Sequence, residues 1–398
     1  MPRIENITIY DGLGGRFENS SLSFDETGII AIGAEKDNEQ ILDGGGLFCI
    51  PGLINLHVHL HANPFKDFGA HPNISEAETA YRSFLNAWEH LRAGSTTVRN
   101  MGSFFDADIK LRDCINQGLL QGPRIFASGI PLTMTGGHAH SMAHEVDGCD
   151  EVRKFARLQL KKGADVVKLF ATGGGMTKGV KPGASQLSEE EMRAACVEAQ
   201  NCGKITGAHA QGNAGIKNAI RAGITTIEHG VELDDEAIAL MLERGTYLVA
   251  TLAAPYNTTK YGVAAGIPEW AVKKNEDALI PHRESFKRAK KAGVKIAAGN
   301  DAGTPFNAHN DFVTELRLMQ ELGMGFDEVL HCATYMGAEA LNMADSLGSL
   351  SPGKLADFVL VEADPKTDIE NLYKVRQVYL GGKLMYDSKG GNKCINIY

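Results

Sequence analysis

The 398-residue sequence has no run of basic residues, and its formal net charge is -9. Proteins that bind nucleic acid or an anionic membrane surface carry a basic patch that attracts phosphate groups, so we expect neither as a partner. The chain also has no apolar span of 18 residues, which argues against a transmembrane helix. Residues 1–6 lack the charged and then apolar pattern of a secretion signal. We therefore expect a cytoplasmic protein.

Cysteine is scarce and shows no pairing pattern. The seven cysteines include no Cys-x-x-Cys pair, and their number is odd. A disulfide framework or a cysteine-rich zinc site needs such pairs. We interpret all seven as reduced thiols, and none lies in a setting that would activate a nucleophilic cysteine.

The two ends of the chain consist of short alternating segments separated by turns that contain glycine. These segments cover residues 4–10, 20–24 and 28–33 near the N-terminus and residues 353–361, 375–379 and 383–386 near the C-terminus. Alternation between such turns is typical of β-strands. The pattern predicts one small β-domain built from residues 1–50 and 348–398.

The middle of the chain, residues 51–347, alternates short β-branched runs with helical stretches. We predict helices at residues 188–199, where Ser188 would cap an acidic first turn, and at 234–244 and 282–292. Eight such strand and helix units match a (β/α)8 TIM barrel. An open doubly wound sheet is the alternative, but no glycine-rich phosphate loop follows the first strand. The predicted strands cover residues 53–59, 95–99, 124–127, 165–170, 204–209, 225–229, 247–251 and 295–301.

Ionisable residues fall at or near the carboxyl ends of these predicted strands. In a barrel those ends converge on one mouth, where the chemistry takes place. Lys168 stands out, because an unpaired ammonium flanked by valine, leucine and phenylalanine is costly to bury. For the first strand, the alternative to a functional site is a polar strand end whose histidines make ordinary hydrogen bonds within the protein. The residues are His57, His59, Lys168, His209, His229 and Asp301.

This set has the chemistry of a metal centre. Zinc and similar divalent ions bind neutral imidazole and carboxylate groups, so four histidines and an aspartate could hold one ion or two. Lys168 fits the same site if its amine has reacted with carbon dioxide, because the resulting carbamate is a carboxylate-like anion that can bridge two ions.

Five segments in this order resemble the amidohydrolase superfamily: residues 51–59, 166–170, 207–210, 227–230 and 299–303. The resemblance implies that the terminal segments form an accessory β-sandwich and that the centre holds two divalent ions, most simply zinc. It further implies that His57, His59 and Asp301 hold one ion and that His209 and His229 hold the other. A carbamylated Lys168 would bridge them.

Within the superfamily the chain is most similar to the prolidase-like and metal-dependent carboxypeptidase-like group, which cleaves dipeptides or N-acyl amino acids. The cues are residues 96–102, 135–138 and 172–175. The resemblance implies that His138 binds the substrate carboxylate or polarises the carbonyl, and an ordinary loop histidine is the alternative at this position. The sequence departs from the group at Asn55 and Asn100, where relatives commonly have aspartate, and at Gln211, which is often aromatic.

The expected reaction is hydrolysis of an amide bond in a small-molecule substrate. Two ions would lower the pKa of a shared water to roughly 7, and Asp301 would accept its proton and return it to the leaving amine. Loops at residues 60–80 and 252–275 should shape the pocket, with Tyr256 as a second candidate for the substrate carboxylate. Asp67 or Glu269 could bind a basic substrate side chain.

Two other functions stay open. A mononuclear deaminase or cyclic amide hydrolase shares the barrel and the histidines, but it has little use for Lys168. A non-catalytic scaffold usually loses metal ligands, and none is missing here. We also expect a homo-oligomer.

Overall fold

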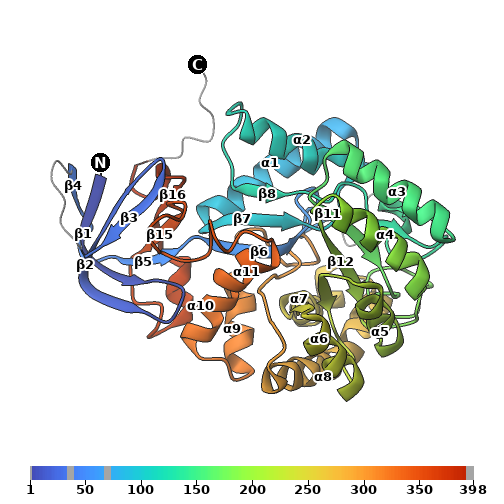
Figure 1. Ribbon diagram of the computed structural model, residues 1–398. Coiled ribbons are helices and arrows are strands. Elements are labelled where there is room, and N and C mark those ends of the chain that lie inside the picture. The colour runs from blue at the N-terminus through green and yellow to red at the C-terminus, as the bar shows by residue number, and fades with distance from the viewer. Residues whose placement is uncertain (1, 34–39, 67–72, 391–398) are drawn as a thin grey trace.

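A computed structural model describes residues 2–33, 40–66 and 73–390 (Figure 1). Strands from both ends of the chain form one eight-stranded sheet at one end of the molecule, as the terminal segments predicted. The sheet order is β17-β16-β15-β5-β1-β2-β3, with β4 paired to β1. These strands are β1 (Pro2–Tyr10), β2 (Arg16–Asp25), β3 (Gly28–Ile32), β4 (Gln40–Asp43), β5 (Phe48–Pro51), β15 (Phe358–Val361), β16 (Val375–Leu380) and β17 (Lys383–Asp387).

The antiparallel pair β5 and β15 joins the two ends of the chain. An aromatic cluster forms the core on this sheet. The rings of Phe358 and Tyr379 stack with centroids 4.4 Å apart, and Phe24 meets Phe358 edge to face at 4.9 Å. All three side chains are buried, so the sheet has a hydrophobic core of its own.

The middle of the chain contains two sheets whose strand pairs are parallel, with order β6-β7-β8 and β10-β9-β11-β12-β13-β14. Because parallel strands need crossover connections, helices separate most of them. The strands are β6 (Leu53–Val58), β7 (Ser95–Asn100), β8 (Arg124–Phe126), β9 (Leu132–Thr133), β10 (His144–Glu145), β11 (Val166–Phe170), β12 (Ile205–Ala210), β13 (Thr226–His229) and β14 (Tyr247–Val249).

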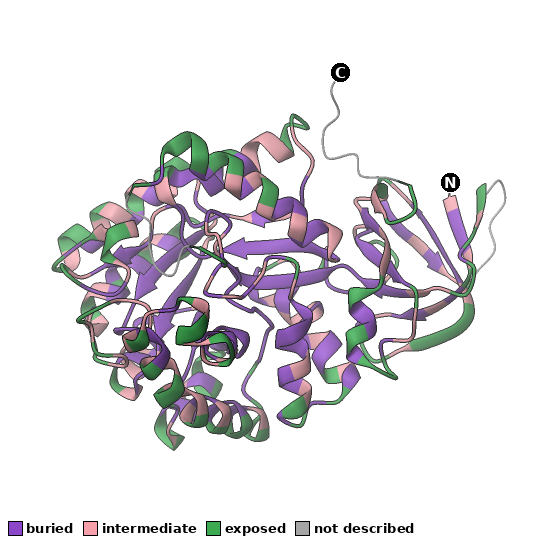
Figure 2. Ribbon diagram, turned by 180° about the vertical axis from the view of Figure 1, so that it is seen from behind, coloured by how far each residue is buried: buried purple, intermediate pink, exposed green. Residues whose placement is uncertain are grey.

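The helices lie around these sheets with exposed residues on their outer faces, while the strands of the two parallel sheets are largely buried (Figure 2). They are α1 (Glu76–Arg92), α2 (Ala107–Asn116), α3 (Cys149–Lys162), α4 (Glu189–Asn201), α5 (Asn213–Ala222), α6 (Asp235–Arg244), α7 (Ala253–Tyr261), α8 (Glu269–Ala292), α9 (Val313–Glu321), α10 (Phe326–Cys332) and α11 (Tyr335–Ala340). Short 3-10 turns are η1 (Phe104–Asp106), η2 (His140–Met142), η3 (Val263–Ala265) and η4 (Ile369–Tyr373).

Backbone hydrogen bonds link the two parallel sheets. On one side, the Asp165 N–H donates to the Ala127 carbonyl at 2.7 Å. On the other side the link runs through residues 295–298, since Ala297 N–H donates to the Leu248 carbonyl at 3.0 Å and Leu56 N–H donates to the Ala298 carbonyl at 3.0 Å. Seven of the eight predicted middle strands are present. The eighth, at 295–301, is reduced to single bridges, because it pairs with each neighbour over too few residues to form a ladder.

All three helix predictions hold, although the third helix begins earlier than expected. Ser188 caps α4 in a capping box with Glu191, and Asp234 caps α6. The predicted helix at 282–292 is instead the last half of α8, which runs from residue 269 straight through Pro281. A proline normally ends a helix, but here the buried apolar face on both sides of it holds the helix together.

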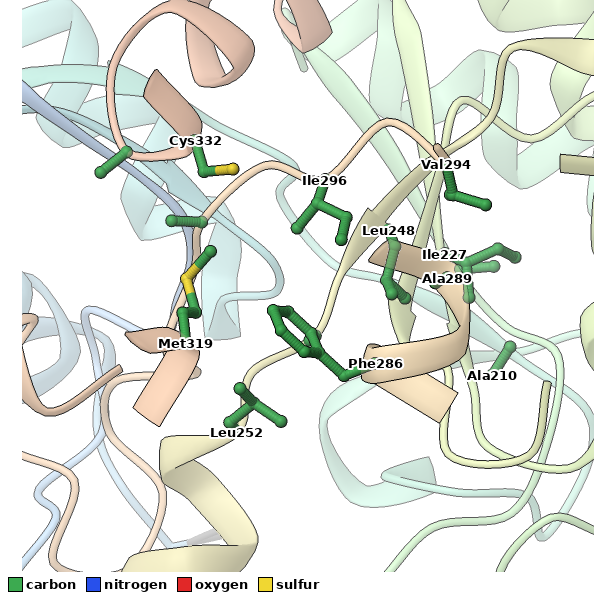
Figure 3. Packing of buried hydrophobic residues seen from close by; sticks show 14 of the residues in the cluster. Ala210, Ile227, Leu248, Leu252, Phe286, Ala289, Val294, Ile296, Met319 and Cys332 are labelled. Carbon is green, nitrogen blue, oxygen red and sulfur yellow. The ribbon is translucent and has the colours of Figure 1, made fainter. Parts of the chain in front are cut away.

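Packing of α8 against the parallel strands stabilises the helix where it continues through Pro281. Figure 3 shows Phe286 lying among Leu248, Leu252 and Ile296, and all four belong to the largest hydrophobic cluster. This cluster also contains Ala289 from the next turn of the helix. A buried phenylalanine contributes about 1.5–3 kcal/mol, which offsets much of the roughly 3 kcal/mol that a proline costs inside a helix.

Two further expectations can be compared with the described residues. Their six cysteines are all free thiols, as expected, while Cys394 lies outside them. Within the same ranges, no helix has the length and hydropathy needed to cross a bilayer.

We predict that Phe358→Ala lowers the free energy of unfolding by about 3–5 kcal/mol, because it removes a fully buried ring from the aromatic core. Urea denaturation checks this value. Leu384→Ala is the matched control, since Leu384 lies in the same sheet but is 49% exposed. Equal stabilities of the two variants would contradict the prediction.

Candidate metal centre

The six residues selected from the sequence line one cavity of about 370 Å³. His57 lies on β6, His59 follows it, Lys168 lies on β11, His209 on β12 and His229 at the end of β13. Asp301 follows the segment at 295–298. Strand ends from the whole middle of the chain therefore meet at one place, as the sequence pattern predicted.

The imidazole rings in this cavity lie close together. The ring centroids of His57 and His229 are 5.3 Å apart, and those of His209 and His229 are 4.5 Å apart. His57, His229 and Asp301 each offer one ligand atom, and these atoms all lie within 4.8 Å of one another. Burial lowers the pKa of His57 and His209 well below the usual value and that of His229 to about 3, so the imidazoles are neutral at pH 7.

Hydrogen bonds determine which nitrogen of His57 carries its proton. Nδ1 lies 2.8 Å from Oε2 of Glu228, and neither side chain is more than 1% exposed. Arg99 donates to both oxygens of Glu228, at 2.8 and 2.9 Å. The paired carboxylate can only accept, so His57 must donate from Nδ1 and the lone pair of its Nε2 stays free.

His229 is fixed in the same way. Its Nδ1 lies 2.6 Å from the hydroxyl oxygen of Thr251, and that hydroxyl donates its own hydrogen to the Ala250 carbonyl at 2.6 Å. The Thr251 oxygen therefore accepts from Nδ1 of His229. The lone pair on His229 Nε2 is left without a protein donor, which is the state that a metal ligand requires.

Asp301 adds a buried carboxylate to the imidazole lone pairs of His57 and His229. Its Oδ1 lies 3.4 Å from Nε2 of His57 and 3.2 Å from Nε2 of His59, yet it is buried without a hydrogen bond among the described residues. A buried carboxylate oxygen that faces an imidazole lone pair is strongly unfavourable unless a cation lies nearby. The donor set of histidine nitrogen and carboxylate oxygen fits a divalent ion such as zinc.

The backbone at two of these positions is strained. His229 has φ 71° and Asp301 has φ 60°, in the left-handed region that non-glycine residues rarely occupy. Thr251, which holds His229, has φ 55°. Each such residue costs of order 1–3 kcal/mol, and strain of this kind is typical of functional sites.

Lys168 is 2% exposed and faces the cavity. Among the described residues its ammonium has no hydrogen bond or ion pair, and the nearest recorded contact is the Phe170 ring at 5.4 Å. Burial lowers the pKa of Lys168 to about 8, although Glu228 and Asp301 act in the opposite direction. The side chain therefore has a readily accessible neutral amine.

His138 lies beside this group. Its ring centroid is 4.4 Å from that of His209, and its Nδ1 is 2.8 Å from the Thr177 hydroxyl. Gly174 allows this close packing, because a Cβ there would lie only 2.5 Å from Nε2 of His138. This close approach accounts for the glycine at position 174, within the segment 172–175 that resembles the prolidase-like group.

A model described as "Amidohydrolase family" matches residues 48–385. The chain belongs to this family. The match confirms the resemblance that the motifs indicated and places the protein among hydrolases that act on carbon–nitrogen bonds.

Relatives of this amidohydrolase include ochratoxinase from Aspergillus niger, which is 30% identical over 369 residues, covering 84% of this chain and 75% of that protein. A crystal structure of a Xaa-Pro dipeptidase with methionine in its active site is 33% identical, with a TM-score of 0.89 over 97% of this chain and 99% of that one. A prolidase bound to N-methylphosphonate-L-proline is 31% identical, with a TM-score of 0.90 and the same coverage.

Two residues of this amidohydrolase site were missed in the sequence. Glu228 and Arg99 are fully buried on β13 and β7. Both stand in β-branched strand segments, as Lys168 does, and a charged residue in such a run was the available signal. The sequence motifs indicate Glu228 only as part of the segment 227–230 and Arg99 only as part of the segment 96–102.

Other expectations need correction or fall outside the described residues. Gln211 lines the cavity, but Tyr256 does not. Tyr256 lies in α7, which replaces the expected loop. The guanidinium carbon of Arg317 lies over its ring, 5.5 Å from the ring centroid. Its aromatic ring is used for packing. Glu269 is exposed at the start of α8 and does not line the cavity, and Asp67 lies outside the described residues.

The two asparagines that replace aspartate have clear partners. Asn55 donates to Oδ1 of Asn300 at 2.7 Å, and its own Oδ1 accepts from the backbone N–H groups of His57 and Asn300, each at 3.3 Å. Asn100 donates to the buried carboxylate of Asp108 at 2.9 Å. An aspartate at either position would place two acceptors face to face.

We predict that Asn55→Asp lowers the free energy of unfolding by about 1–3 kcal/mol, because the new carboxylate faces Oδ1 of Asn300 and loses the donor that this oxygen needs. Thermal unfolding of the metal-free protein provides the measurement. Asn310→Asp, at an exposed position, is the control and should behave like the wild type. An Asn55→Asp protein as stable as the wild type would refute this explanation of why asparagine stands in place of aspartate at position 55.

Proposed function

We propose that this chain is a binuclear metal-dependent amidohydrolase that cleaves the amide bond of dipeptides or N-acyl amino acids. The observation that carries the proposal is the convergence of His57, His229 and Asp301, whose unpaired acceptor atoms lie within 4.8 Å of one another in a cavity. The similarity to proteins named Xaa-Pro dipeptidase, prolidase and ochratoxinase supports an amide substrate of this kind.

The proposal includes a scaffold in two units. Residues 51–347 would form one closed (β/α)8 barrel, and residues 1–50 with 348–398 would form the accessory β-sandwich. The hydrogen bonds from Asp165 to Ala127 and from Leu56 to Ala298 support closure, because they join the two parallel sheets on both sides. The likeness to solved amidohydrolase structures along nearly the whole chain also supports it.

We assign the ligands as the sequence motifs implied. His57, His59 and Asp301 would hold one divalent ion, His209 and His229 would hold the other, and a carbamate on Lys168 would bridge them. Imidazole and carboxylate donors favour zinc. The neutral amine of Lys168 would add to carbon dioxide, which forms a nitrogen–carbon bond, releases one proton and leaves an anion in place of an unpaired cation.

When bound, the ions would polarise the amide carbonyl and make a water molecule acidic enough to react at neutral pH. The chain supplies the proton transfers. Asp301 would accept the proton of the attacking water and pass it to the amine nitrogen as the carbon–nitrogen bond breaks. The products are a carboxylic acid and a free amine.

His138 would bind the substrate. The Thr177 oxygen accepts from the backbone N–H of Ala139 at 3.0 Å, so its hydroxyl hydrogen is available to Nδ1 of His138 at 2.8 Å. In that arrangement the proton of His138 lies on Nε2, beside His209. An N–H donor at this position suits either the carbonyl oxygen in the transition state or the substrate carboxylate.

The residues that line the cavity favour a small substrate that has an apolar part. Phe170, Met176 and Trp270 line it, and Asp301 is the one carboxylate among its described lining residues. A basic substrate side chain would therefore find no counter-ion in the described part of the wall. Apolar side chains or acyl groups suit this surface.

We predict that protein made with zinc and bicarbonate contains about two ions per chain and releases free amino acid from some member of a library of dipeptides and N-acyl amino acids. Elemental analysis and amino-acid detection test the two parts together. Asp301→Asn is the matched inactive control. One ion per chain with an inert library would favour the mononuclear deaminase or cyclic amide hydrolase, and no ion would favour the scaffold.

We predict that Lys168→Met keeps or raises the thermal stability of the metal-free protein but lowers the metal content and abolishes hydrolysis. Methionine removes an unpaired buried ammonium at similar volume, so unfolding would not explain the loss. Normal metal content and activity in this variant would show that Lys168 has no bridging role.

A further inference from the structure

We propose that Glu228, held in place by Arg99, is a positioning residue that keeps the proton of His57 on Nδ1 and so keeps Nε2 available to a metal ion. The inference rests on the proposed function, since it assigns His57 as a ligand. It adds a buried ion pair to the site as a determinant of metal affinity.

The orientation of Glu228 is fixed from several sides. Oε2 faces Nδ1 of His57 at 2.8 Å, both oxygens accept from Nη2 of Arg99, and the Thr226 hydroxyl donates to Oε1. The side chain has no exposed surface. A carboxylate with this many partners cannot rotate away from His57 without losing at least one charge-assisted hydrogen bond.

Arg99 is anchored independently of Glu228. Its Nε donates to the Leu56 carbonyl at 2.6 Å, and its Nη1 donates to the Thr226 hydroxyl at 2.8 Å. The guanidinium thus connects β7 with β6 and β13, which lie in the two different parallel sheets. It presents a fixed pair of N–H donors to Glu228 whatever occupies the cavity.

The negative charge of Glu228 is what determines the proton position on His57. A glutamine has the same shape but offers one acceptor and one donor. Oε2 accepts from both His57 and Arg99, and Oε1 accepts from both Arg99 and Thr226, so the amide nitrogen of a glutamine would face a donor at either position. If the amide nitrogen faces His57, the imidazole must accept at Nδ1, and its proton moves to Nε2, where it points toward Asp301 and blocks a metal ion.

A purely structural role for the pair makes a different prediction. In that case Arg99 and Glu228 would only fill the centre of the molecule, and replacing both with apolar residues of similar length would remove the charges without consequence for the cavity. The single variant leaves an unbalanced buried arginine, whereas Arg99→Met/Glu228→Met does not. Comparison of the two variants separates stability from positioning.

The experiment is a calorimetric titration of the full-length, metal-stripped protein with zinc, together with thermal unfolding. We expect Glu228→Gln to bind zinc about 10- to 100-fold more weakly than the wild type. Glu315→Gln is the matched control, because Glu315 is also a buried acidic side chain, and it accepts from the backbone N–H groups of Leu252 and Ala253. Its zinc affinity should equal that of the wild type.

The double variant decides between positioning and packing. We expect Arg99→Met/Glu228→Met to unfold at a higher temperature than Glu228→Gln while its zinc affinity stays equally weak. If Glu228→Gln does not fold, the zinc affinity of the double variant is compared directly with that of the wild type. Wild-type zinc affinity in either variant would overturn the inference and leave the proposed function intact. Failure of the wild-type protein to bind zinc would overturn both.

Discussion

Arg99 and Glu228 meet at the centre of the molecule without exposed surface, and the polar groups around them are arranged to satisfy this pair. Leu56 offers its carbonyl, Thr226 its hydroxyl and His57 its Nδ1 proton. Removing two charges from water costs several kcal/mol per ion unless each is fully hydrogen-bonded, so the strands that carry these groups cannot shift relative to one another. The geometry of the cavity above them follows from that requirement.

The convergence of the proposed ligands on one cavity could be predicted from the sequence because their signal is local. His57, His209 and His229 each stand at the end of a β-branched run, and parallel strands bring such ends to one edge. The same reasoning found the terminal sheet, since alternation and turns at both ends of the chain indicated strands. The expected sandwich came from the family resemblance and stays a proposal, and the described terminal strands belong to one hydrogen-bonded sheet.

The partners of those ligands could not be predicted, because they depend on contacts between residues far apart in sequence. Glu228 lies 171 positions from His57. Thr251 reaches His229 only because the backbone turns left-handed at both residues. The first half of α8 was missed for a related reason: Pro281 locally favours a helix start, and the packing of Phe286 and its neighbours holds the helix together on both sides of it. Local patterns identify chemical groups, while their protonation and orientation are set by tertiary structure.

The pairing of β5 with β15 also has a consequence for synthesis on the ribosome. Phe358 pairs with Pro51, so about 300 further residues must be synthesised after β5 before this sheet can be completed. At typical translation rates this takes about 15–60 s, and during that time β5 presents an open edge that can pair with other nascent chains. The two parallel sheets can form in the interval, whereas the sheet that contains β1 and β5 stays incomplete until the last strands emerge.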